Sequence, residues 1–203
     1  MKKVHLGTCG ATLIHGDIAL TAAHVSPNQC FWIVVVSFSV LSRLMIANTK
    51  VVSVSIEKDE SSQLNHILSF SVSSLRSDLN EALVGAHVRS STSDGAQYTT
   101  IAERVPHPNY DNRTEEYDFM LLKLGGWMQY PVVSLNANSY IPAAGETLTT
   151  MGFGDTSAGG STSTTLLQVN LTSVANQICR QDYPEYIFYP TVMMCAASPG
   201  KDR

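Results

Sequence analysis

The chain has 203 residues, of which 44% are hydrophobic and 15% charged, enough for one sizeable hydrophobic core or two small ones. Its formal net charge of -4 and pI near 5.8 give no basis for binding nucleic acid or an anionic membrane surface. Neither an enzyme nor a binding module is excluded by these totals, so the order of the residues must decide between them.

Short β-like segments occupy both ends of the chain. ATLI and IALTAA flank the turn His15-Gly16-Asp17, and YTTIAERV, DFMLLKL, ETLTTMGFG and TTLLQVNLTSV follow, each bounded by Gly, Pro, Asn or Asp. Short strands at this spacing predict a barrel or a sandwich. One short helix is expected over Ala175 to Tyr183, and a loop over Thr156 to Thr165.

The middle of the chain has a different composition. From Phe31 to about Glu81 it is rich in Ser, Val and Leu and contains neither Gly nor Pro. Its apolar run, Phe31 to Ala47, is shorter than the roughly 20 residues of a membrane-spanning helix and carries Arg43. We therefore expect no stable membrane span, and treat residues 25–80 as an atypical insertion that is either disordered or intron-derived.

Four cysteines, with no Cys-x-x-Cys spacing, favour one or two disulfides over a metal site. The glycosylation sequons at Asn112 and Asn170 point weakly toward a secretory route as well. The N-terminal text MKKVHLGTCGATLI has two lysines but lacks the apolar stretch of a signal peptide. Either the protein is cytosolic or its true start lies upstream, and we expect a secreted protein.

Several motifs follow one another in an order that resembles the trypsin-like (chymotrypsin-fold) serine endopeptidases. His24 in LTAAHV follows Cys9 by 15 residues, HPNY begins at His107, and YDFMLLKL carries Asp118. The matching segments also include Gly152-Phe153-Gly154, where the family has Gly-Trp-Gly, and Gly200-Lys201-Asp202, similar to its G-K-D. The resemblance covers about residues 7–25 and 82–203 and omits the middle.

The resemblance implies an all-β, chymotrypsin-like double β-barrel whose second barrel is incomplete, in a single peptidase domain over residues 1–203. His24 would be the general base and acid, because an imidazole can take a serine proton and return it to the leaving amine. Asp118 would hold the imidazole in one tautomer and stabilise the imidazolium.

Each of these residues also has an ordinary interpretation. A single His after an apolar run is usually a surface or core residue, and a single Asp before a strand is usually a turn residue. The joint pattern favours the catalytic interpretation of His24 and Asp118. The remaining histidines form no H-E-x-x-H or similar pair, so we expect neither a metal nor a cofactor.

The resemblance also implies a disulfide and a specificity pocket. Cys179 and Cys195 match the disulfide beside the pocket, and Asp202 lies 7 residues after Cys195, where trypsin has its pocket-floor aspartate. A carboxylate there would select Arg or Lys at the cleavage point by ion pairing. Alternatively, Asp202 belongs to a charged tail, and the adjacent Arg203 could neutralise it.

No Gly-Asp-Ser-Gly sequence is present in the chain, so the nucleophilic serine and the oxyanion glycine of the family have no counterpart. In a serine protease whose catalytic residues were removed one at a time, loss of the serine alone lowers turnover by about 10⁶-fold. We therefore expect a monomer of the serine endopeptidase family, acting on protein or peptide substrates, that is inactive as given. A non-catalytic homologue that binds a protein partner is the alternative.

Two explanations account for the middle insertion. The family usually has Cys directly after His, whereas this chain has Val25-Ser26, a dipeptide compatible with a splice donor. A retained intron would explain both the lost cysteine and the changed composition, and we favour it. The alternative is a true insertion in which Cys30 replaces the missing disulfide partner of Cys9.

Overall fold

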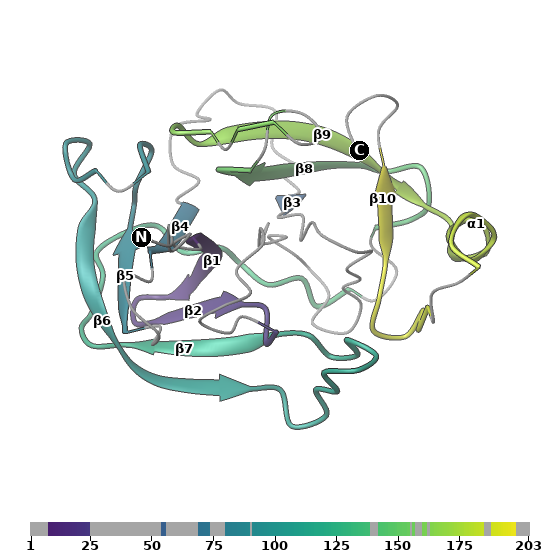
Figure 1. Cartoon of the computed structure of the whole chain (residues 1–203), viewed down its shortest axis with the longest axis horizontal. Coiled ribbons are helices and arrows are strands. Elements are labelled where there is room, and N and C mark those ends of the chain that lie inside the picture. The colour runs from purple at the N-terminus through teal and green to yellow at the C-terminus, as the bar shows by residue number, and fades with distance from the viewer. Residues whose placement is uncertain are drawn as a thin grey trace, which may run out of the picture.

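The structure is a computed structural model that describes residues 8–24, 54–55, 69–73, 80–89, 91–138, 142–154, 156, 160–161, 163–184 and 188–197. Its elements, in chain order, are β1 (Thr8–His15), β2 (Ile18–Thr21), β3 (Val54–Ser55), β4 (Ser69–Ser73), β5 (Glu81–Val84), β6 (Gln97–Pro106), β7 (Met120–Leu124), β8 (Thr147–Gly152), β9 (Leu167–Val174), α1 (Asn176–Asp182) and β10 (Cys195–Ala197). Strands dominate these residues, and they form two separate sheets (Figure 1). The predicted all-β class is therefore confirmed.

The first sheet closes into a barrel. Its strands follow the order β1-β2-β7-β6-β5-β4, and β4 pairs with β1 to complete the circle. Every neighbouring pair is antiparallel, as short loops between consecutive strands allow. In Figure 1 this barrel occupies the left part of the molecule.

The barrel core follows the alternation of the strands. In β7, Met120, Leu122 and Leu124 are buried, whereas Lys123 between them is exposed. Successive side chains of a strand point to opposite faces, so these three residues lie inside together, whereas Leu121 is only partly buried. Leu13 of β1 joins the same buried cluster, and the periodicity read from the sequence is therefore that of a half-buried strand.

A tight turn joins β1 to β2 at the predicted His15-Gly16-Asp17. The Asp17 carboxylate accepts a hydrogen bond from Nζ of Lys123 on β7 and lies 2.6 Å from Nδ1 of His15. Gly16 is needed here because a Cβ at this position would lie 2.3 Å from Cε2 of Trp127. The turn is thus fastened to the segment that follows β7.

The second sheet has four strands in the order β10-β9-β8-β3. Its main pair is β8 with β9, from Thr147 opposite Thr172 to Gly152 opposite Leu167. Within the described part of the chain this sheet does not close, which agrees with the expected incomplete second barrel. The predicted helix is present as α1, directly after β9 and next to β10 (Figure 1).

Two strands come from the atypical middle segment. β4 pairs with β1 on one side and β5 on the other, and β3 forms a two-residue pair with β8. The other residues of 25–80, including the apolar run Phe31 to Ala47, lie outside the described residues. Among the described helices, none has the length and apolarity to cross a bilayer.

Candidate active site

His24 and Asp118 are brought together by the pairing of β2 with β7. β2 ends at Thr21, and Thr21 lies opposite Met120, the first residue of β7. His24 follows the end of β2, and Asp118 precedes the start of β7, so both residues leave the barrel at the same edge. They meet although 94 positions separate them in the sequence.

Both carboxylate oxygens of Asp118 accept a hydrogen bond from His24. Oδ2 lies 2.6 Å from the ring Nδ1, and Oδ1 lies 2.7 Å from the backbone N of the same residue. The Asp118 side chain is only 1% exposed, and that of His24 is 18% exposed. With Nδ1–H donated to the carboxylate, the neutral ring carries its lone pair on Nε2, the nitrogen that a general base needs.

The surroundings of His24 raise its pKa above the usual value. Burial of the ring lowers the pKa, but the hydrogen bond that the ring donates to Asp118, the negative charge of Asp118 and the charge of Glu115 together raise it by more. A positively charged imidazole is favoured beside a buried carboxylate, because the attraction between the two opposite charges offsets the cost of removing them from water. The site therefore stabilises the imidazolium that forms when the ring accepts a proton.

Further negative charge gathers around the two residues. The pKa of Glu115 is raised, mainly by burial and also by the negative charge of Asp118. The nearby His24 opposes part of this rise. Burial and the charges of Asp118, Glu115 and Asp111 raise the pKa of Tyr110 to about 12. Sequence reasoning missed Glu115 and Tyr110 as parts of the site, although Tyr110 belongs to the HPNY motif and Glu115 precedes Asp118 by three positions.

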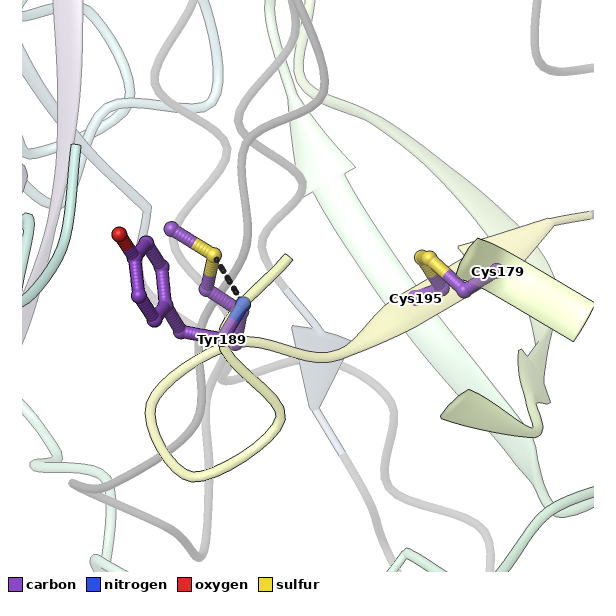
Figure 2. The surroundings of a disulfide bond; sticks show 4 residues. Cys179, Tyr189 and Cys195 are labelled. Carbon is purple, nitrogen blue, oxygen red and sulfur yellow. Dashed lines mark hydrogen bonds between the residues drawn. A yellow bond between two sulfur atoms is a disulfide. The ribbon is translucent and has the colours of Figure 1, made fainter. Parts of the chain in front are cut away.

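The predicted disulfide between Cys179 and Cys195 is confirmed. Their Cα atoms are 6.2 Å apart, and the bond joins α1 to β10 (Figure 2). Cys179 is fully buried in an apolar cluster with Phe188, Val192 and Met193. The bond thus fixes the helix against the edge strand of the second sheet.

Other predicted site residues lie partly outside the described part of the chain. Asp202 and Cys30 belong to undescribed stretches, so the acidic pocket floor and the Cys9–Cys30 bridge remain predictions. Asn112 is exposed in the loop between β6 and β7. Asn170 is exposed on β9, where its Oδ1 accepts a hydrogen bond from the Thr149 hydroxyl at 2.9 Å. Glycosylation at both asparagines also remains a prediction.

A metal site finds no support in the part of the chain that is described. No group of three or more His, Cys, Asp or Glu side chains there is arranged to hold an ion.

Comparison with known proteins places the chain in a family. Residues 65–203 match the Trypsin family, which is more than half of the chain, and this protein therefore belongs to that family. The match begins within the segment 25–80, so the resemblance extends further toward the N-terminus than the motifs from Ala82 onward indicated.

Individual relatives agree with this assignment. The chain is 32% identical to Trypsin-1 of Astacus astacus over 127 residues, covering 59% of this chain and 52% of that protein. It is 30% identical to Mast cell protease 2 of Meriones unguiculatus over 59% of this chain and 49% of the relative. It is 28% identical to Granzyme B of Homo sapiens over 61% of this chain and 51% of the relative. The aligned part thus spans about half the length of these curated relatives.

A solved structure described as "Structure of GrC" shares the fold. Its TM-score is 0.62 at 20% sequence identity, and the superposition covers 95% of this chain and 64% of the other. The double-barrel architecture expected from the sequence is confirmed by this likeness, which at such low identity concerns the fold alone.

Proposed function

We propose that this chain supplies the general base, His24, and the orienting carboxylate, Asp118, of a serine endopeptidase. The observation that carries the proposal is the buried Asp118 carboxylate, both oxygens of which accept hydrogen bonds from His24. Nε2 of His24 takes the proton of the attacking hydroxyl and later gives it to the leaving amine. Asp118 keeps Nδ1–H in place and compensates the positive charge of the ring during both steps.

An endopeptidase of this design also requires a nucleophilic serine and oxyanion donors. The 203 residues present no serine in the family's Gly-Asp-Ser-Gly context. We therefore expect a polypeptide of these residues alone not to hydrolyse peptide bonds. For the complete site we propose a preference for Arg or Lys, selected by Asp202 if Arg203 leaves that carboxylate uncompensated.

We also propose that the protein is secreted and glycosylated. The disulfide between Cys179 and Cys195 supports folding in an oxidising compartment. Asn112 supports the glycan, because it is exposed in a loop where a sequon is accessible.

Sequencing the source transcript across the codons of Val25 and Arg203, then expressing the whole reading frame, tests the proposed function. If C-x-G-D-S-G-G-P follows Arg203, the purified product should be labelled at one serine by a phosphonylating reagent. The matched variant His24→Ala should not be labelled, since the hydroxyl then lacks its base. A frame that encodes this motif but yields no His24-dependent labelling after activation would refute the catalytic role.

The non-catalytic homologue, which binds a protein partner, remains the second candidate. The closed first barrel would then be the part that binds a protein partner. A reading frame that ends without the family motif, together with a reproducible complex in the source extract, would decide for this candidate.

A further inference from the structure

Three aromatic rings surround the backbone on both sides of Asp118. The His107 ring stacks on Tyr117, with centroids 4.6 Å apart and planes within 3°. The same ring lies 4.5 Å from the Phe119 ring at 60°. Tyr117 and Phe119 are the residues directly before and after Asp118. The His107 ring, which follows the end of β6, therefore contacts both sequence neighbours of the buried Asp118.

The backbone at Asp118 turns sharply between these two flanks. The Phe119 N–H donates to the Tyr117 carbonyl at 2.7 Å, which makes Asp118 the central residue of a three-residue turn. The His107 N–H donates to the Phe119 carbonyl at 2.9 Å and joins the turn to β6. The direction of the Asp118 side chain is therefore set by the backbone of Tyr117 and Phe119.

Tyr117 adopts a backbone conformation that bulky residues avoid. Its φ is 53°, in the left-handed region, which costs a non-glycine residue about 1–3 kcal/mol. Such a conformation persists only when surrounding contacts hold it. Besides the stack on His107, the Tyr117 ring packs against the cluster formed by Cys179, Phe188, Val192 and Met193.

The second contact crosses from one sheet to the other. The loop between β6 and β7 extends along the lower edge of the barrel toward the turn before β10 (Figure 1). That turn carries Tyr189, whose N–H donates to Sδ of Met193 at 3.4 Å (Figure 2), and Tyr189 packs against the same apolar cluster that contains Cys179. Tyr117 thus lies between the disulfide-bonded part of the second sheet and the carboxylate of the first barrel.

We propose that Tyr117 is a positioning residue that makes the His24–Asp118 hydrogen bonds depend on the disulfide cluster of the second sheet. The cluster and His107 hold the Tyr117 ring, and the ring holds the left-handed backbone. That backbone orients Asp118. The proposal rests on the proposed function, since it concerns the same pair of residues.

The test uses the full 203-residue chain and does not need activity. In ¹⁵N-histidine-labelled protein, a hydrogen bond to a carboxylate moves the Nδ1 proton of His24 far downfield, and the ring titration gives its pKa. Wild type must show the downfield proton, and its absence would count against the proposed site itself. The critical variant is Tyr117→Gly, since glycine removes the ring yet tolerates a positive φ.

In Tyr117→Gly we expect loss of the downfield proton and a fall in the His24 pKa. Tyr117→Phe should restore both, because the phenyl ring can make the same stack. Tyr117→Asn provides a second test if glycine prevents folding, since asparagine also occupies the left-handed region. Replacing the exposed Tyr98 by Ala is the matched control and should leave His24 unchanged.

The role of the second sheet is tested by the double variant Cys179→Ala, Cys195→Ala. It should shift the His24 proton in the same direction as Tyr117→Gly. A folded Tyr117→Gly chain with an unaltered His24 proton would overturn the proposal while leaving the proposed function intact. An unaltered proton in the cysteine variant would overturn the dependence on the disulfide cluster.

Discussion

Substitution of Asp118 by Asn removes the negative charge from the pair while keeping the size of the side chain. Asp118 is 2% exposed and accepts hydrogen bonds at 2.7 and 2.6 Å from His24. In the variant, burial still lowers the pKa of His24, but the strongest opposing effects are gone. A nearby opposite charge shifts a pKa by about 1–3 units, so we expect the His24 pKa to fall by at least about one unit. One unit corresponds to about 1.4 kcal/mol.

The same change should make stability depend differently on pH. The folded-state pKa of His24 is raised, so its stabilisation is fully present below the unfolded value of about 6.5 and is lost as pH rises through the folded pKa. Urea unfolding should therefore show a larger difference between wild type and Asp118→Asn near pH 5 than near pH 9. Both measurements use the 203-residue chain.

Asp111→Asn is the control for these measurements. Asp111 pairs with Arg113 on the surface of the same loop, whereas the raised pKa of His24 comes from Asp118 and Glu115. This variant should leave the His24 titration close to that of wild type. Equal His24 pKa values in wild type and Asp118→Asn would refute the electrostatic reasoning.

Three further substitutions, one of them with a matched control, test the fold. Leu122→Ala should destabilise by about 2–5 kcal/mol in urea unfolding, because Leu122 is 0% exposed, whereas Leu135→Ala, at 37% exposure, should cost far less. Gly85→Ala should destabilise by about 1–3 kcal/mol, since φ is 80° and the new Cβ would lie 2.5 Å from Cε1 of Tyr130; a neutral effect would show that this ring moves freely. Thr150→Val should raise the melting temperature, because the buried Thr150 hydroxyl has no hydrogen-bond partner among the described residues and unpaired burial costs about 1–3 kcal/mol; a lower melting temperature would reveal a missed partner.

Strands with apolar or β-branched residues between clear turn signals could be predicted from the sequence. DFMLLKL contains β7, in which Met120, Leu122 and Leu124 meet the barrel core and Lys123 meets solvent. YTTIAERV lies within β6, where Ile101 is the one fully buried residue, so its turn residues and β-branched content indicated the strand more than alternation did. The disulfide between Cys179 and Cys195 required the family resemblance, since four cysteines allow three pairings. The strands were thus predictable from local sequence patterns, and the disulfide was predictable from the spacing of cysteines in the family.

Strands that depend on distant partners were missed. SFSVS of β4 lies in serine-rich text, and its identity as a strand comes from pairing with β1 and β5 on either side. β10 has three residues, and its pairing with β9 accompanies the disulfide at Cys195. Neither segment shows enough alternation to be recognised alone, because β-structure depends strongly on neighbours.

The conformation of the loop before Asp118 was also beyond sequence reasoning. Glu115 and Tyr117 have positive φ values of 57° and 53°, although neither residue type favours the left-handed region. Tertiary contacts hold these conformations, and the sequence contains no local glycine or asparagine at either position that would reveal them. The backbone conformation of this loop could therefore be found only from the three-dimensional structure.

The atypical middle segment leaves the candidate site intact for a topological reason. The meeting of His24 with Asp118 depends on the register of β2 against β7, in which Thr21 lies opposite Met120. The middle segment enters the chain after His24 and returns through β4 and β5, which lie on the other side of the barrel circuit. Extra length in such a connection costs little, because loop-closure entropy grows only with the logarithm of length. An insertion of either origin, a retained intron or a true extension, is therefore compatible with the hydrogen bonds of Asp118, provided that its last part supplies β4.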